Sequence, residues 1–351
     1  MTGDAPFPVP GGQAVPALPG PSAAVIEAPG GVSMQLPAFI ADAGEDAAHA
    51  TFEFFTARIP NAHTRKAYGR AVAEFCAWCQ GHGVALRTLA APTVSAYLAG
   101  LQEPQADRDG LSLASVKLTA SAIRHWLDFL TERGVLAHNP ARSVRTPRLV
   151  VREGKTPVMD REQGRRLFTS LDAAAAAGDL RALRDRALMA LMLYGFVRVG
   201  AAVAMRVRDF EDEGEHANLV LHEKGGKERR IACHHKTREY LRAYIQAAGF
   251  EPRAKVPLFQ SAPRRSATLT GQGMSIDDAL RAVKRRCRTA ALPSSICNHS
   301  FRATGITVHQ ENGGRLEDAQ ELAGHADART TRLYVRRSRK VAQAEVERVQ
   351  L

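Results

Sequence analysis

Five basic side chains and one tyrosine in the C-terminal half of the chain have the types and order that phosphate chemistry requires. They are Arg198, Lys224, His299, Arg302, His325 and Tyr334. Guanidinium groups bind the non-bridging oxygens of a phosphate bidentately and stabilise the charge that builds on it during reaction. Histidine exchanges protons, lysine can donate one to a leaving oxygen, and an assisted tyrosine hydroxyl is a nucleophile. The set predicts phosphodiester transesterification that needs no divalent metal.

The local sequence around these residues supports treating them as one group. Arg198 follows the hydrophobic run "LMLYGFV", so its guanidinium should emerge beside a core. His299 and Arg302 are three residues apart in "HSFR", which places them on one face of a helix. Tyr334 follows His325 by nine positions in the cationic stretch "GHADARTTRLYVRR". The competing interpretation makes Tyr334 an amphipathic residue at the edge of a basic surface helix.

The order and spacing of these motifs resemble the tyrosine recombinase, or phage integrase, family. The resemblance extends over about residues 48–340. It is strongest in "LAGHADARTTRLYV", which is similar to the family's Gly-His, Thr-Thr and Tyr pattern nearly position by position. The stretch "NAHTRKAYGRAVAEFCAWC" likewise resembles the start of the family's SAM-like core-binding domain. A site-specific integrase or recombinase is therefore the expected function.

The resemblance also implies a role for each residue of the group. Tyr334 would attack the scissile phosphate and leave a 3′-phosphotyrosyl link and a free 5′-hydroxyl. Arg198 and Arg302 would bind the phosphate, and His325 would donate a hydrogen bond to it. Lys224 would protonate the leaving oxygen, and His299 would assist proton transfer. Tyr194, Tyr240 and Tyr244 are expected to have packing roles.

Two departures from the family pattern concern the surroundings of the basic residues. The family usually carries a serine and an acidic residue two and three positions after its first arginine, and this chain has Gly200 and Ala201 there. Loss of the carboxylate would alter how nearby basic groups are oriented. Lys227 also competes with Lys224 for the lysine role, and Lys224 is preferred because it is the first lysine of the Gly-Gly turn.

The sequence periodicity predicts a mainly α fold with a small antiparallel sheet. Helical spacing over "NAHTRKAYGRAVAEFCAWCQGHG", a helix opening at Pro92 and a third over about 112–133 predict a small helical domain. In the second domain, Asp160 with Gln163 resembles a capping box, and Asp179 begins another helix. "HANLVLHEKGGKERRIAC" predicts two strands joined by a Gly-Gly turn. Further helices are expected over 235–248, 275–290, 299–311, 315–323 and 327–336, with a last one from about Ser338.

Composition shifts divide the chain into five segments. They are a Pro/Gly/Ala-rich segment 1–46 expected to be disordered, a SAM-like helical core-binding domain 47–138, a basic linker 139–156, a mixed α/β catalytic domain 157–338, and a C-terminal helix or tail 339–351. The resemblance implies that the two domains clamp duplex DNA.

A basic excess favours nucleic acid as the partner. Lys and Arg number 48 against 36 Asp and Glu, which gives a formal charge of +12. The residues expected to contact DNA are His63, Arg65, Lys66, Arg145, Arg148, Lys227, Arg285 and Arg286. For the last two, in "RAVKRRCRTA", a solvated helix face is an equal alternative. Phosphate contacts carry little sequence information, so the target site is not predicted.

Further expectations concern assembly and location. The resemblance implies a homotetramer on two double-stranded DNA sites, monomeric or dimeric off DNA, with accessory DNA-bending proteins as an additional partner class. No cofactor or metal is expected. No apolar run reaches the roughly 20 residues that span a bilayer, so a cytoplasmic, nucleoid-associated bacterial protein without membrane contact is expected.

Three other functions compete with a strand-exchange enzyme. A topoisomerase-like enzyme would use the same chemistry, and a catalytically idle DNA-binding protein of the same fold would explain the missing acid at Ala201. A zinc site is the third, with His222, Cys233, His234 and His235 as ligands, although strand alternation points adjacent members to opposite faces. The five scattered cysteines, including those of "CAWC", are expected to be free thiols.

Overall fold

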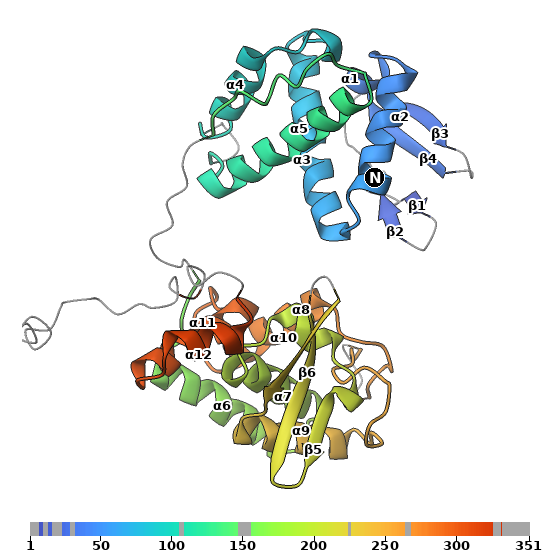
Figure 1. Cartoon of the computed structure of the whole chain (residues 1–351). Helices are drawn as coiled ribbons and strands as arrows, with labels where there is room; N and C mark the ends of the chain where they lie inside the picture. Colours follow the sequence, from blue (N-terminus) through green and yellow to red (C-terminus); the bar gives the residue numbers. More distant parts are fainter. Residues whose placement is uncertain are drawn as a thin grey trace, which may run out of the picture. The chain divides into compact units, whose positions relative to one another are not determined.

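Figure 1 shows the computed structural model of the chain. It describes residues 7–9, 13–15, 23–28, 32–104, 109–146, 156–223, 226–263, 268–325 and 331. The chain divides into two compact units, 1–150 and 151–351. The division falls inside the segment that was expected to link two domains.

The first unit has a helical core. Its helices are α1 (Ala38–Ala41), α2 (Glu45–Glu53), α3 (Ala62–Gly81), α4 (Ala91–Gly100) and α5 (Leu113–Glu132), with a π-helical turn over Phe54–Arg58 and a 3-10 turn over Leu86–Thr88. Asn61 and Ser112 cap α3 and α5 by accepting hydrogen bonds from backbone N–H groups. Trp126 of α5 is fully buried and donates to Thr51 Oγ1 at 3.1 Å. The predicted helical domain is confirmed.

The N-terminal segment contains more structure than its composition predicts. Its strands form two antiparallel pairs, β1 (Phe7–Val9) with β2 (Gln13–Val15) and β3 (Ala23–Ala28) with β4 (Val32–Pro37). Leu36, Phe39 and Ile40 are buried in the core of the first unit. The expected disorder therefore does not hold for the end of this segment, where three apolar side chains pack in the core of the first unit.

The beginning of the expected linker also belongs to the first unit. The side-chain amide of Asn139 donates to the carbonyl of Arg124 at 2.9 Å and to Asp128 Oδ1 at 2.7 Å. Ala141 and Val144 are buried in the same core. These contacts fix the chain as far as residue 144 on the first unit, so a linker can begin only after it.

The second unit combines helices with one small sheet. Its elements are α6 (Arg161–Ala176), α7 (Leu180–Tyr194), α8 (Val199–Ala204), β5 (Phe210–Glu213), β6 (His216–Glu223), β7 (Lys227–Ala232), α9 (His235–Ala247), α10 (Ile276–Thr289), α11 (Asn298–Glu311) and α12 (Leu316–Ala323). The strands form an antiparallel sheet in the order β5-β6-β7. The predicted hairpin is confirmed, and β5 is an additional strand.

Helix α7 is the centre of the second unit. It packs against α6, α9 and α11 (Figure 1), and the side chains from Ala187 to Met192 are fully buried. The capping box of Asp160 and Gln163 at α6 and the cap of α7 by Asp179 are present as predicted. The expected helices over 235–248, 275–290, 299–311 and 315–323 are α9 to α12. Those over 327–336 and after Ser338 lie outside the described residues, apart from Thr331.

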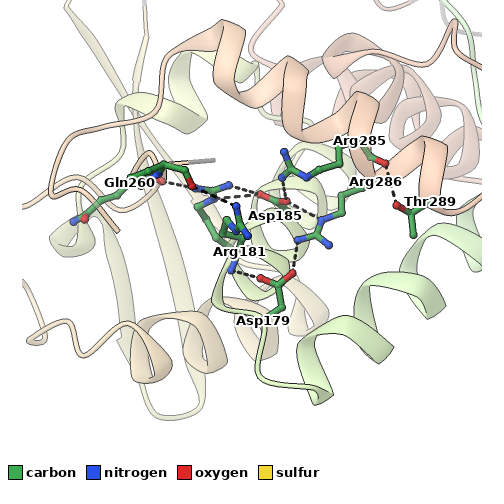
Figure 2. A network of polar contacts seen from close by, with 9 residues as sticks. Asp179, Arg181, Asp185, Gln260, Arg285, Arg286 and Thr289 are labelled. Carbon is green, nitrogen blue, oxygen red and sulfur yellow. Dashed lines mark hydrogen bonds and ion pairs between the residues drawn. The ribbon is translucent and has the colours of Figure 1, made fainter. Parts of the chain in front are cut away.

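A buried carboxylate joins α7 to α10. Asp185 is fully buried, and its Oδ2 accepts from Arg285 at 2.7 Å and from Arg286 at 2.9 Å, while its Oδ1 accepts from Arg184 at 2.8 Å (Figure 2). Arg286 also donates to Asp179 Oδ2 at 3.0 Å. This network fixes the C-terminal part of α10 against the start of α7.

Candidate active site

Three arginines converge on the C-terminal end of α12. Arg229 donates to the carbonyls of Glu321 at 3.3 Å and Leu322 at 2.8 Å. Arg302 donates to the carbonyl of Ala323 at 2.6 Å, and Arg198 to that of Gly324 at 3.0 Å. The last carbonyls of a helix have no intrahelical partner and carry partial negative charge, so guanidinium groups stabilise them. Four successive carbonyls thereby anchor the end of α12 to β7, α11 and the start of α8.

Arg302 is the most deeply placed of the three. Its side chain comes from α11 and is 2% exposed. Besides Ala323, it donates to the carbonyl of Phe196 and lies 2.5 Å from Nε2 of His325. A buried guanidinium in fixed geometry is a preorganised donor for an anion.

Tight packing between α7 and α11 sets this geometry. A Cβ on Gly305 would collide with the carbonyl of Leu193 and with the ring of Phe196, so a glycine is required there. Phe196 itself has a φ of 50°, a left-handed conformation that non-glycine residues rarely adopt. Its carbonyl accepts the hydrogen bond from Arg302. The close approach therefore brings Arg302 to the chain just before Arg198.

His325 is held as a neutral imidazole. It is 8% exposed, its Nε2 faces Arg302, and its Nδ1 lies 2.8 Å from Thr331 Oγ1. Because Nε2 accepts from the guanidinium, Nδ1 carries the proton and donates to Thr331. Burial, followed by the charges of Arg302, Arg198 and Arg229, lowers the pKa of His325 to about 4.

We expect the stability of the protein to depend on pH through His325. Its folded-state pKa lies below the ordinary value of 6.5, so its contribution is fully present above about pH 6.5 and is lost as the pH falls through about 4. Urea unfolding should therefore show a steeper loss of stability over this range for the wild type than for His325→Gln. Equal pH dependence of the two proteins would contradict the neutral assignment.

His299 lies in the first turn of α11, beside the same arginines. Although its side chain is exposed, partial desolvation of the imidazole lowers its pKa below the ordinary value, and the charges of Arg302 and Arg198 lower it further. A neutral imidazole can accept a proton, which is the chemistry that the sequence predicted for this residue.

Arg198 presents the most accessible guanidinium of the site. It is the N-cap residue of α8, and its side chain is 40% exposed. Its Nη1 donates to Glu223 Oε1 at 3.0 Å, and Arg229 Nη2 donates to the same oxygen at 3.2 Å. The sequence motifs did not single out Glu223 or Arg229. The only signal was their position in "HEKGGKERR", on either side of the Gly-Gly turn.

The structure thus brings together four of the six residues expected to carry the chemistry. Arg198 and Arg302 donate hydrogen bonds to carbonyls at the end of α12, and Arg302 also contacts His325. The positive charges of both arginines lower the pKa of His299. Lys224 and Tyr334 lie outside the described residues. Thr331, three positions before Tyr334, is fully buried and bonded to His325.

Comparisons with known proteins identify the family of the chain. Residues 157–340 match the phage integrase family, and residues 55–134 match the phage integrase N-terminal SAM-like domain. The chain belongs to the phage integrase family. Tyrosine recombinase XerC of Proteus mirabilis is 29% identical over 239 residues, which cover 65% of this chain and 69% of that protein. XerD of Listeria monocytogenes is 26% identical over 229 residues, covering 65% and 73%.

Solved structures of similar fold include a site-specific recombinase and an integrase bound to DNA. XerH site-specific recombinase in a post-cleavage complex with palindromic difH substrate has a TM-score of 0.65 at 16% identity, covering 88% of each chain. A lambda integrase dimer bound to a COC′ core site has a TM-score of 0.57 at 16% identity, covering 82% of this chain and 76% of that one. Both likenesses confirm the predicted fold class.

The eight residues expected to contact DNA fall into different environments. His63, Lys66, Arg145, Lys227 and Arg285 are exposed, and Arg148 lies outside the described residues. Arg65 is 2% exposed and donates to the carbonyls of Ile59 and Pro60, so it stabilises the entry into α3. Arg286 is engaged by two carboxylates (Figure 2). We therefore do not retain Arg65 and Arg286 as DNA contacts of this integrase-family chain.

The residues of the zinc alternative are separated by their contacts. His222 Nε2 lies 3.3 Å from Asp209 Oδ2, whereas the ring of His234 stacks on Tyr194 with centroids 4.2 Å apart. In the described part of the chain, no group of three or more His, Cys, Asp or Glu side chains is arranged to hold a metal ion. The five cysteines are free thiols. Among the same residues, no helix has the length and apolar character needed to cross a membrane.

Burial disfavours the other tyrosines of this unit as nucleophiles. Desolvation raises the pKa of Tyr194, Tyr240 and Tyr244 above the ordinary value. A phenol whose pKa is raised forms the reactive phenolate less readily. Packing roles for these three residues agree with the sequence-based expectation.

Proposed function

We propose that this integrase-family chain is a site-specific DNA recombinase that cuts and rejoins DNA through a 3′-phosphotyrosyl intermediate. The observation that carries the proposal is the convergence of Arg198, Arg302 and His325 at the end of α12, ten residues before Tyr334. That end is fixed in place by hydrogen bonds to three arginines. We infer that Tyr334, in the sequence that follows this end, attacks a phosphate bound by Arg198 and Arg302.

The proposed reaction is a pair of transesterifications. The Tyr334 hydroxyl transfers its proton to His299 as it forms a bond to phosphorus, and the bond from phosphorus to the 5′-oxygen breaks. That oxygen leaves as a hydroxyl after taking a proton, for which Lys224 is the donor. In rejoining, a 5′-hydroxyl gives its proton to Lys224 and attacks the phosphorus of the phosphotyrosyl link. The bond from phosphorus to Tyr334 breaks, and the phenol oxygen takes a proton from His299. Arg198 and Arg302 stabilise the phosphate charge in both steps, as guanidinium groups do in phosphoryl transfer.

Duplex DNA is the proposed partner. The net charge of +12 and the exposed basic residues His63, Lys66, Arg145 and Lys227 support it. Arg285 is exposed as well, although it also donates to Asp185. The titles of the structural neighbours describe recombinases and integrases bound to DNA. We further propose a homotetramer acting on two DNA sites of the bacterial nucleoid, with accessory DNA-bending proteins as additional partners.

Strand cleavage by the full chain tests this proposal. We expect a denaturant-resistant protein–DNA adduct when the protein is incubated in EDTA with nicked suicide duplexes from the ends of its genetic element. Tyr334→Phe should bind the same duplex and form no adduct, because the phenol oxygen is the nucleophile. Tyr194→Phe serves as the matched control and should cleave normally. Binding by the wild type without any adduct would favour the idle DNA-binding protein, whose support is the absence of an acid at Ala201.

A further inference from the structure

The most unusual feature of the site is the carboxylate that pairs with its exposed arginine. Glu223 is the last residue of β6, and its side chain is 17% exposed. One oxygen, Oε1, accepts hydrogen bonds from both Arg198 and Arg229. A carboxylate shared by two guanidinium groups restricts both in position and offsets their mutual repulsion.

The backbone around Glu223 is held on both sides. Glu223 pairs with Lys227 at the end of the β6–β7 ladder, and it is the residue before Lys224 in the sequence. Gly324 approaches the carboxylate so closely that a Cβ there would lie 3.0 Å from Oε1. Gly324 also has a φ of 59°, a left-handed conformation that favours glycine, and a Cβ there would require the carboxylate to shift by a few tenths of an ångström. Glu223 therefore contacts a site in which the sheet, the end of α12 and α8 meet.

The residues that follow Arg198 at the start of α8 provide no carboxylate that could pair with it in place of Glu223. Gly200 and Ala201 occupy the positions where an integrase of the usual pattern carries a serine and an acid, and neither has a polar side chain. A basic group that binds a ligand is often held in its orientation by a neighbouring carboxylate, and removal of that carboxylate typically lowers activity. In this chain the acid reaches Arg198 from β6 instead of from α8.

We propose that Glu223 is a positioning residue that orients Arg198 toward the scissile phosphate and replaces the acid absent at Ala201, while Arg229 holds the same carboxylate in place. The inference rests on the proposed recombinase function. The carboxylate of Glu223 and the DNA backbone are both negatively charged, so Glu223 does not increase the affinity of the protein for DNA. It restrains the guanidinium of Arg198 in the geometry that the transition state needs, and therefore acts on the rate of cleavage and not on binding.

The inference is tested by measuring the rate of adduct formation and the affinity for DNA separately. With protein saturating a suicide duplex, Glu223→Gln should form the adduct about 10- to 100-fold more slowly than the wild type. Its Kd for the same duplex should be unchanged or lower, because a negative charge near the phosphate is removed. Glu223→Asp keeps the charge and should recover part of the lost rate.

A matched control separates this role from a structural one. Glu211 pairs with Arg230 at 2.6 Å on the same sheet, away from the site, so Glu211→Gln should retain wild-type cleavage. Glu223→Gln with the wild-type rate, or Gln and Asp variants that are equally slow, would overturn the inference. So would a loss of DNA affinity that accounts for the whole defect. Failure of the wild type itself to form an adduct would instead defeat the proposed function.

Discussion

Replacement of Arg302 by lysine is expected to abolish most cleavage while leaving the protein able to bind DNA. Arg302 contacts the carbonyls of Phe196 and Ala323 and also His325, and a lysine ammonium cannot reach three such partners in one plane. Losing one preorganised donor of this kind slows reaction roughly 100- to 1000-fold. Single-turnover adduct formation on a saturating suicide duplex measures the effect.

The control for Arg302→Lys is an arginine that also bonds a carbonyl but lies outside the site. Arg206 is exposed and donates to the carbonyl of Lys255 at 2.9 Å, so Arg206→Lys should cleave at the wild-type rate. Thermal unfolding of both variants shows that the proteins compared are folded. Arg302→Lys that remains folded and cleaves as fast as the wild type would exclude Arg302 from the phosphate site.

Replacement of Asp185 by asparagine is expected to cause the largest loss of stability. Asp185 is fully buried and accepts from Arg184, Arg285 and Arg286 (Figure 2). Arg184 is itself 4% exposed, so the substitution leaves a buried guanidinium without its carboxylate. Breaking a buried ion pair in this way costs about 3–5 kcal/mol. The free energy of unfolding of the second unit, measured with urea, shows this loss.

An exposed ion pair of the same unit provides the comparison. Glu162 and Arg165 lie on the surface of α6 with 65% and 74% of their side chains exposed. Such pairs contribute about 0–1 kcal/mol, so Glu162→Gln should shift the unfolding midpoint little. If Asp185→Asn were as stable as Glu162→Gln, the network of Figure 2 would not hold α7 against α10.

Much of the fold could be predicted because its signals are local. The capping box at Asp160, the cap at Asp179 and the hairpin of β6 and β7 each depend on a few adjacent residues. The structured part of the N-terminal segment could not be predicted in this way. Leu36, Phe39 and Ile40 are stabilised by a core formed from residues far along the chain, which composition does not reveal.

For the site, the sequence identified individual residues but not the tertiary contacts between them. Order and spacing identified Arg198, Arg302 and His325, and the structure joins them at one helix end. The pairing of Glu223 with Arg198 spans 25 residues and depends on strand register and on the approach of Gly324. The burial of Arg65 depends equally on the turn before α3. Such tertiary contacts leave no periodic signal in the sequence.

Mapping the covalent link between protein and DNA tests whether Tyr334 is the nucleophile. A trapped adduct can be digested with a protease and the peptide that carries the nucleotide identified by mass spectrometry. We predict a phosphotyrosyl bond at Tyr334 to the 3′ side of the cut, with the 5′ end left as a hydroxyl. A link at another residue, or a 5′-phosphotyrosyl bond, would contradict it.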